Sequence, residues 1–204
     1  MKKTVFLTGG SGNMGFAGFK ELYKRKDMYN IVLLNLDTQD ARKKFAPYMF
    51  DPAVRCVWGD LTSYEDVLSC VDGADYVLHI GGLVSPAADY YPKKTLFTNI
   101  TAMENIVKAV KAQPDPDKIK VVYIGTVAQT GDRNYPTHWG RTGDPIQISV
   151  YDHYAISKTV AEQLLAESGL RYWVSLRQTG ILYPDILKNM DPIMYHVPIN
   201  GGLE

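Results

Sequence analysis

Tyr154 and Lys158 stand four residues apart in the segment YDHYAISKTVAEQLL, which has the spacing of an amphipathic helix. Residues four apart lie on one face of a helix, so a phenol and an ammonium are expected side by side. A tyrosine acts as a general acid and base near neutral pH only if its pKa of about 10 falls by roughly three units. One cation at about 4 Å supplies that stabilisation at an effective dielectric constant near 20. The pair therefore predicts proton transfer by Tyr154, with Lys158 beside it and no metal ion.

The same segment has a second interpretation, in which Tyr154 packs as an ordinary core residue and Lys158 extends along the rim of the apolar face. The expected apolar face consists of Ile156, Val160, Ala161, Leu164 and Leu165. Thr126, at the end of an expected strand, carries a hydroxyl group that can orient a substrate oxygen. Taken alone, Thr126 is also an ordinary strand residue, so other parts of the chain have to decide between the two interpretations.

The segment TGGSGNMG, Thr8 to Gly15, lies between an expected strand and an expected helix. Gly9, Gly12 and Gly15 allow a tight turn, outward-facing backbone amides and close packing of the helix on the sheet. Such a turn holds the pyrophosphate of a dinucleotide at the start of a helix. Its spacing is GxxGxxG rather than the commoner GxGxxG, so a plain connecting turn is the alternative.

The residues after the second expected strand indicate how the ribose of a dinucleotide would be held. Asp37 ends the segment NIVLLNLD and is a candidate for the ribose hydroxyl groups, but Asn35 lies on the same strand face and is the alternative. Arg42, Lys43 and Lys44 follow, and a 2′-phosphate would attract such residues. We interpret them as the solvated face of a helix and favour NAD over NADP.

Asp60 and Leu61, in the segment GDLTS, follow the third expected strand and are expected beside the adenine of the dinucleotide. Thr62 and Glu65 have the spacing of a capping box, in which the threonine caps the next helix. This cap would leave the Asp60 carboxylate available for a ligand.

Short apolar, β-branched runs alternate with longer amphipathic segments along the chain. The expected strands occupy residues 3–9, 30–37, 53–60, 74–81, 118–126 and 171–178, and the expected helices occupy residues 13–27, 38–46, 62–70, 92–112 and 150–168. Nearly continuous apolar strands are typical of a parallel sheet that is covered on both faces. The alternation predicts an α/β fold with a doubly wound parallel sheet, Rossmann-like in its order.

The composition predicts one sizeable core, since 46% of the 204 residues are hydrophobic. Lys plus Arg and Asp plus Glu are balanced at 22 each, which gives no reason to expect a nucleic acid or an anionic membrane as partner. Cys56 and Cys70 lack the spacing of a zinc site or a disulfide scaffold, and no apolar run reaches membrane-spanning length. A small-molecule substrate and a cytoplasmic location are expected.

In order and spacing, these features resemble the extended short-chain dehydrogenase/reductases, in particular the NAD-dependent epimerase/dehydratase group. The motifs that carry the resemblance are TGGSGNMG, GDL at Gly59–Leu61, HIGGLVSP at His79–Pro86, Asn99 in TNITAMENIV, the strand end at Thr126, Tyr154-x-x-x-Lys158 and LRQTGILYP at Leu176–Pro184. The chain departs from the family pattern where Thr126 replaces a serine and where HIGG replaces HxAA. It departs again where the ribose acid is split between Asn35 and Asp37.

The resemblance implies that Tyr154 is the general acid and base, that Lys158 binds a ribose and lowers the pKa of Tyr154, and that Thr126 assists. It further implies that a set of residues from several segments contacts NAD, or alternatively NADP. These residues are Gly9, Gly12, Asn13, Met14, Gly15, Asp37, Asp60, Leu61, Gly81, Gly82, Asn99 and Lys158. Among them, Gly81 and Gly82 are expected on the nicotinamide side, and Asn99 is expected to support the site.

Residues 1–180 are expected to form a dinucleotide-binding domain, and residues 181–204 the start of a substrate lobe that is largely missing. The resemblance implies an NAD(P)-dependent enzyme, most simply a nucleotide-sugar epimerase or dehydratase. A non-catalytic dinucleotide sensor and a carbonyl or steroid reductase are the alternatives, and a homodimer is compatible with each. Candidates for recognising the substrate lie between Ala128 and Ser149: Arg133, His138, Trp139 and Arg141.

Overall fold

The computed structural model describes residues 2–131 and 140–181. Its centre is a parallel sheet of six strands in the order β3-β2-β1-β4-β5-β6. The strands are β1 (Lys3–Thr8), β2 (Tyr29–Asn35), β3 (Val54–Trp58), β4 (Tyr76–His79), β5 (Lys120–Thr126) and β6 (Trp173–Gln178). This is the order of a doubly wound, Rossmann-like sheet, so the predicted fold class is confirmed.

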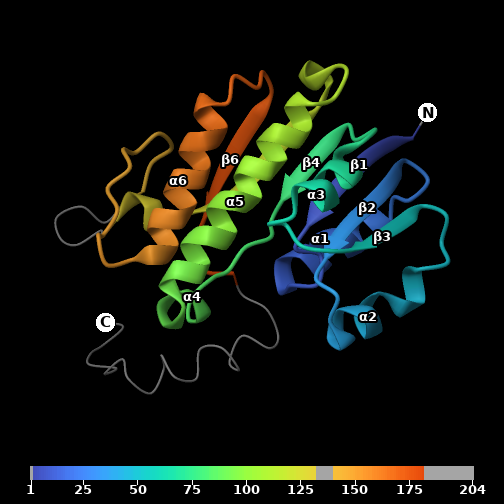
Figure 1. The fold of residues 1–204 in the computed structure, drawn as a ribbon, viewed down its shortest axis with the longest axis horizontal. Coiled ribbons are helices and arrows are strands. Elements are labelled where there is room, and N and C mark those ends of the chain that lie inside the picture. Colours follow the sequence, from blue (N-terminus) through green and yellow to red (C-terminus); the bar gives the residue numbers. More distant parts are fainter. Residues whose placement is uncertain (1, 132–139, 182–204) are drawn as a thin grey trace, which may run out of the picture.

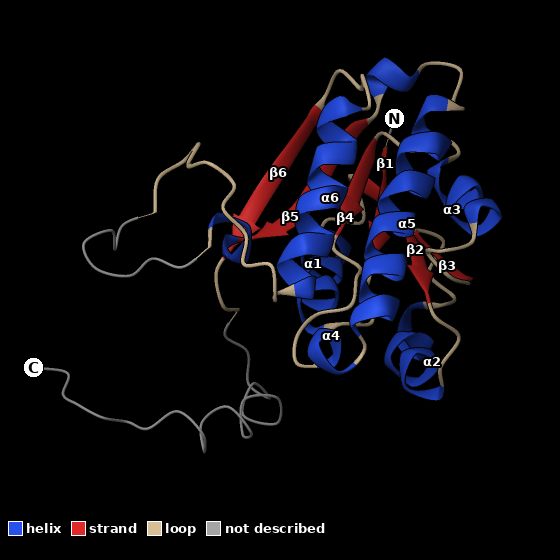
Figure 2. Ribbon diagram, turned by 60° about the vertical axis from the view of Figure 1, so that its left-hand side comes forward, coloured by secondary structure: helices blue, strands red, loops and turns tan. Residues whose placement is uncertain are grey.

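Helices connect the strands and cover both faces of the sheet (Figures 1 and 2). They are α1 (Asn13–Tyr23), α2 (Gln39–Phe45), α3 (Tyr64–Val71), α4 (Ala87–Tyr90), α5 (Pro92–Lys111) and α6 (His153–Glu167). Three single turns of 3-10 helix, η1 (Ala46–Tyr48), η2 (Pro116–Lys118) and η3 (Val127–Thr130), complete the described elements. All five expected helices are present with shifted ends, whereas the short α4 was not expected from the sequence.

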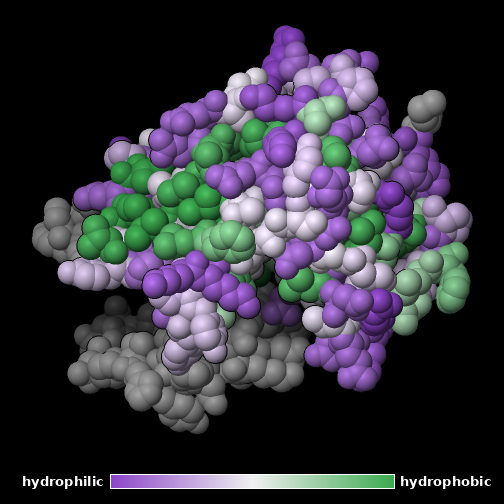
Figure 3. Space-filling view, viewed as in Figure 1, coloured by the Kyte–Doolittle hydropathy of each residue, from purple (hydrophilic) through white to green (hydrophobic). Residues whose placement is uncertain are grey.

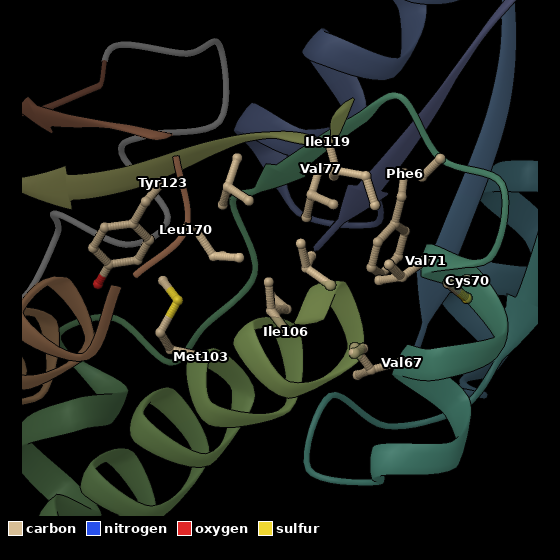
Figure 4. Close-up of a cluster of buried hydrophobic side chains, with 14 of the residues drawn as sticks. Phe6, Val67, Cys70, Val71, Val77, Met103, Ile106, Ile119, Tyr123 and Leu170 are labelled. Atoms are coloured by element: carbon tan, nitrogen blue, oxygen red, sulfur yellow. The ribbon is translucent and has the colours of Figure 1, made fainter. Parts of the chain in front are cut away.

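The core consists of two hydrophobic clusters, one on each face of the sheet. Successive residues of a strand point to opposite faces. Phe6 therefore lies in the cluster under α3, α5 and α6, and its neighbour Leu7 lies in the cluster under α1 and α2. Figure 4 shows the first cluster, in which Met103 of α5 is fully buried. In the second, the rings of Phe19 and Phe45 lie 5.1 Å apart at 75°. Burial on both faces explains why the strands are nearly continuously apolar.

The carboxyl ends of the parallel strands meet at one edge of the sheet. Thr8 ends β1 and pairs with Leu34 of β2 and with His79 of β4, at the point where the strand order reverses. Ligands of open α/β sheets bind at such a point. β2 ends at Asn35, so the prediction that Asp37 ends this strand is wrong by two residues.

β6 lies at an edge of the sheet, and its apolar side chains are only partly covered. Trp173, Val174 and Leu176 are 37%, 44% and 44% exposed. On the face shown in Figure 3, hydrophobic residues also gather over α5 and α6 among hydrophilic ones. Among residues 2–131 and 140–181, no helix combines the length and the hydropathy that crossing a membrane requires.

Candidate active site

The glycine-rich turn between β1 and α1 is packed so closely that side chains would not fit. Gly9 has φ of +67°, and a Cβ atom there would lie 2.6 Å from the Cα atom of Gly81. A Cβ atom at Gly15 would lie 2.0 Å from the carbonyl oxygen of Gly9. The turn therefore needs glycine both for its backbone conformation and for its contact with the segment after β4.

The first turn of α1 has the properties of an anion-binding site. Its N-cap is Gly12, which has no side chain to cap the helix, and the first turn contains no acidic residue. The first backbone amides of a helix have no partner within the helix, and the helix dipole makes this end positive. The residues here fit a pyrophosphate, as the glycine spacing predicts.

Thr8 joins the ends of β1 and β4. Its Oγ1 accepts hydrogen bonds from the backbone amides of Ile80 and Gly81 at 3.1 and 2.9 Å, and it lies 2.9 Å from Nδ1 of His79. Burial, together with the nearby charge of Lys158, lowers the pKa of His79 to about 3. His79 is therefore neutral, and its Nδ1 is available to accept the hydrogen bond of the Thr8 hydroxyl.

A cavity of about 860 Å³ lies along this edge of the sheet. It is lined by most of the residues expected from the sequence: Gly9, Gly12, Asn13, Met14, Gly15, Asp60, Leu61, Gly81, Gly82, Thr126, Tyr154 and Lys158. These residues come from five separate segments of the chain. The structure thus brings the glycine-rich turn and the Tyr154 segment to one cavity.

Two of the expected residues do not line the cavity. The Asp37 carboxylate is about half exposed and forms an ion pair with Arg42, at 2.5 and 2.8 Å. Asn35, which ends β2, lines the cavity instead. Asn99 lies behind the cavity, where its side chain bonds both backbone groups of Leu83 and the hydroxyl of Ser157. Asn99 therefore has the supporting position expected of it, whereas Asp37 faces Arg42.

The predicted capping box at Thr62 and Glu65 is wrong. Ser63 is the N-cap of α3, and its hydroxyl accepts the backbone amide of Asp66 at 3.3 Å. Thr62 instead donates its backbone amide and its hydroxyl to the Asp60 carboxylate, at 2.8 and 2.9 Å. Asp60 thus lines the cavity while closing its own turn, and it is not left without a partner as the sequence had suggested.

Three successive turns of α6 contact the end of β5 and the turn after it. The hydroxyl of Thr126 is close enough to the phenol of Tyr154 to lower the pKa of that phenol. One turn later, Nζ of Lys158 donates to the carbonyl oxygen of Ile124 at 2.9 Å. One turn further, Glu162 accepts from the amide of Gln129 at 2.9 Å. The spacing of four residues places all three on one helix face, so the shared face predicted for Tyr154 and Lys158 is confirmed.

The buried face of α6 differs from the predicted apolar arc. Its buried residues are Ala155, Ser157, Lys158, Ala161, Glu162 and Leu165, whereas Ile156, Val160 and Leu164 are only partly buried. Lys158 therefore does not lie at the rim of an apolar face but inside it, 3% exposed. A lysine in this position is not explained by the alternative in which its ammonium reaches the solvent.

The pKa values of the pair differ from the sequence expectation. Burial raises the pKa of Tyr154, and the hydrogen bond from Thr126 lowers it by less. Burial also lowers the pKa of Lys158 to about 8. Without a bound ligand, the phenol is thus the stable form of Tyr154, and the expected decrease of its pKa is not present. A further positive charge in the cavity would be needed to favour the phenolate.

Several polar residues of the site were missed by sequence reasoning. Ser11, Lys94, Thr98 and Gln178 also line the cavity. Behind it, the buried Gln129 accepts the backbone amide of Thr126 at 2.8 Å, and Glu162 receives Arg177 at 2.5 Å. The sequence contains one signal for this network. Glu162 is a charged residue four positions after Lys158, which is itself four positions after Tyr154, so the three residues share one helix face.

Some candidates for substrate recognition lie outside the described residues, namely Arg133, His138 and Trp139. Arg141 is described; it is exposed, and it does not line the cavity. Residues 182–204, most of the expected second domain, are likewise outside the described part. Within residues 2–131 and 140–181, no group of three or more His, Cys, Asp or Glu side chains could hold a metal ion, and Cys56 and Cys70 are free thiols.

Known proteins resemble the chain in sequence over about half of its length. The UDP-glucose 4-epimerase of Rickettsia massiliae is 28% identical over 110 residues, which are 52% of this chain and 32% of that protein. The corresponding enzyme of Rickettsia bellii is also 28% identical over 110 residues. The chain thus matches about a third of the length of these curated relatives.

Solved structures share the fold over a longer stretch. WbmG of Bordetella bronchiseptica, in complex with NAD and UDP, aligns with a TM-score of 0.75 and 21% identity, over 96% of this chain and 59% of that one. The UDP-glucose 4-epimerase of Thermus thermophilus, in complex with NAD, aligns with a TM-score of 0.69 and 22% identity, over 85% and 54%. A model of the NAD dependent epimerase/dehydratase family matches residues 5–180, which include the glycine-rich turn and the Tyr154 segment. The chain therefore belongs to the NAD dependent epimerase/dehydratase family.

Proposed function

We propose that this chain binds NAD in the cavity and provides the proton-transfer site of an epimerase or dehydratase that acts on a nucleotide sugar. The observation that carries the proposal is that Tyr154, Lys158 and Thr126 line the same cavity as the uncapped start of α1. The nucleotide sugar is proposed from the relatives, among them UDP-glucose 4-epimerases and a structure that holds NAD and UDP.

The cavity fits the parts of a dinucleotide. The glycine-rich turn and the first amides of α1 would hold the pyrophosphate, and Asp60 with Leu61 would lie at the adenine. Gly81 and Gly82 would line the nicotinamide side, where a Cβ atom at Gly82 would lie 2.8 Å from Oδ1 of Asn99. When bound, the nicotinamide accepts and returns a hydride.

The residues of α6 and β5 would then handle the proton. Tyr154 would take a proton from a substrate hydroxyl and later return it. Thr126 accepts the backbone amide of Ala128, which leaves its own hydroxyl proton to donate to Tyr154 as the phenolate develops. The Lys158 ammonium donates one of its three N–H groups to Ile124, and the other two would be available to the cofactor ribose.

The first test is a titration of the chain with NADH, in which the fluorescence of the nicotinamide reports binding. We expect saturable binding, and Tyr154→Phe is expected to leave the affinity unchanged within about threefold, since Phe removes only the hydroxyl. No saturable binding of either NADH or NADPH would contradict the cofactor proposal.

The second test concerns the chemistry and measures turnover of UDP-hexoses by the protein. Tyr154→Phe should lower kcat by about a hundredfold or more, because the general acid and base is lost. Unchanged turnover in a variant that still binds NADH would reject the role of Tyr154 and leave the cofactor proposal intact. A dinucleotide sensor would bind NADH with no turnover in the wild type.

The assembly and the location of the protein stay predictions. A homodimer is supported only by apolar side chains at the surface, such as Phe97 of α5, which is 62% exposed. Sedimentation of the protein over a range of concentrations tests it, with a monomer at all concentrations as the contrary result. The cytoplasmic location rests on the sequence alone.

A further inference from the structure

Lys158 carries a buried ammonium group without a carboxylate partner. It is 3% exposed, and its Nζ donates to the carbonyl oxygen of Ile124 at 2.9 Å. Glu162, one turn further along α6, forms its ion pair with Arg177. Within residues 2–131 and 140–181, no carboxylate forms an ion pair with Lys158. Because a buried charge is costly unless it is compensated, other groups have to stabilise this ammonium.

Tyr123 of β5 contacts Lys158 at both ends of the lysine. Nζ of Lys158 lies 4.9 Å from the centroid of the Tyr123 ring. The hydroxyl of Tyr123 donates to the backbone carbonyl oxygen of Lys158 at 3.1 Å, on the side of the ring that faces α6 (Figure 4). The ring thus lies beside the ammonium, while the hydroxyl holds the helix backbone from which the lysine side chain starts. Both ends of a long, flexible side chain are therefore fixed by one residue.

The Tyr123 ring can stabilise a cation without carrying a charge of its own. The face of an aromatic ring is electrostatically negative, and its attraction for a cation is strongest where water is excluded. Tyr123 is itself only 1% exposed. Burial raises the pKa of its phenol, so the hydroxyl stays protonated and continues to donate to the carbonyl oxygen of Lys158.

The other titratable groups near Lys158 supply no negative charge at neutral pH. From β4, the ring of His79 stacks on that of Tyr123 at 5.6 Å, and burial keeps His79 neutral. On α6 itself, burial raises the pKa of Tyr154, which is therefore a phenol. From α5, the exposed Lys94 lines the same cavity and adds only a positive charge. The Tyr123 ring and the backbone carbonyl of the next residue are thus the groups that stabilise the ammonium.

We propose that Tyr123 is a positioning residue for Lys158, whose ring stabilises the ammonium at the cavity and whose hydroxyl fixes the helix that carries it. The inference concerns the protein without a ligand. That the ammonium then serves a cofactor ribose and Tyr154 rests on the proposed function. With a pKa of about 8, Lys158 is mostly protonated at neutral pH, and loss of the ring would leave much of it neutral.

The test is an NMR titration of the protein alone, with its lysines isotopically labelled at Cε, from about pH 6 to 11. The signal of Lys158 is assigned by its absence from the spectrum of Lys158→Met. In the wild type, we expect the ε-protons of Lys158 to lie upfield of those of exposed lysines, because they lie beside the Tyr123 ring. A position among the signals of exposed lysines would overturn the inference.

Three variants separate the ring from the hydroxyl and from general effects. Tyr123→Leu should lower the pKa of Lys158 from about 8 to about 7 or below and remove the upfield shift. Tyr123→Phe keeps the ring and should retain both the pKa and the upfield shift. Tyr76→Leu is the matched control on the neighbouring strand. Its ring lies 5.5 Å from the ammonium of the exposed Lys120, so its loss should leave the Lys158 signal unchanged.

An unchanged or raised pKa of Lys158 in folded Tyr123→Leu would overturn the inference. If thermal melting shows that Tyr123→Leu is unfolded, Tyr123→Phe decides, and loss of the upfield shift or a pKa near 7 in that variant would contradict the role of the ring. The titration contains no cofactor. A failure of the protein to bind NADH would therefore contradict the proposed function and leave this inference standing.

Discussion

Gln129 and Glu162 are joined by a hydrogen bond of 2.9 Å that ties the turn after β5 to α6. The other end of the same Gln129 side chain accepts the backbone amide of Thr126. Glu162 lies two helical turns after Tyr154, whose pKa the Thr126 hydroxyl lowers. The Gln129–Glu162 contact therefore holds the end of β5, which carries Thr126, against the helix that carries Tyr154.

Replacing Glu162 by Gln should destabilise the fold. The Glu162 carboxylate receives Arg177 and Ser175 as well as Gln129, and its side chain is 10% exposed. The change leaves the guanidinium of Arg177 without its charge partner. We expect a loss of about 2 to 3 kcal/mol in the free energy of unfolding, less than for a completely buried pair, because water reaches the quarter-exposed Arg177 side chain. Urea denaturation measures the loss.

Glu167→Gln is the matched control for this change. Glu167 lies on the same helix, is exposed and bonds only the nearby Gln163 among the contacts described. Its replacement should alter stability by less than about 0.5 kcal/mol. Equal effects of the two substitutions would contradict a special role of the Glu162 network.

The stability of the protein should depend on pH through Lys158. Burial lowers the folded-state pKa of Lys158 to about 8, below its ordinary value of 10.5. The unfolded chain therefore binds more protons between these two values, and stability rises with pH across this window. Below about pH 8 the destabilising contribution of the buried charge is fully present.

The measurement is the free energy of unfolding from about pH 7 to 11, compared between the wild type and Lys158→Met. The difference between them should change across the window from about pH 8 to 10.5 in favour of the wild type. Lys20→Met, the same substitution at an exposed position of α1, should follow the wild type. A constant difference for Lys158→Met would show that the ammonium is not destabilised by burial.

Gly15→Ala should damage both the fold and the cavity. Its Cβ atom would lie 2.0 Å from the carbonyl oxygen of Gly9, so the turn has to move. We expect a loss of about 1 to 3 kcal/mol and NADH binding weakened at least about tenfold. Gly18→Ala on the same helix is the control, because its Cβ atom meets nothing closer than 3.9 Å and alanine favours the helix. Equal NADH affinity in both variants would exclude the turn from binding.

Under the proposed function, Thr126→Val should shift the pH dependence of turnover. The Thr126 hydroxyl lowers the pKa of Tyr154, so its removal raises that pKa, and the oxidative half-reaction should require a higher pH. Thr126→Ser keeps the hydroxyl and should retain the wild-type profile. Identical pH profiles for Thr126→Val and Thr126→Ser would show that the Thr126 hydroxyl has no part in the acid–base chemistry.

Some of this protein could be predicted from its sequence because the signals are local. Alternation of apolar strands with amphipathic helices depends on residues within one segment, and it predicted the parallel Rossmann-like sheet. The glycine-rich turn is also a local pattern, because its conformation requires glycine. The pair Tyr154 and Lys158 is another, because a spacing of four residues places both on one helix face. These patterns were also enough to identify the family to which the chain belongs.

The tertiary structure decided the contacts between distant segments. That β2 ends at Asn35 and that Asp37 turns to Arg42 depend on strand register and side-chain direction, which one strand pattern does not contain. Ser63 caps α3, whereas Thr62 bonds Asp60 in the preceding turn. The burial of Lys158 and Glu162 follows from the packing of α6 against β5 and β6. Hydrogen bonding and desolvation act through space, so residues far apart in the chain set the charge and the donors of the site.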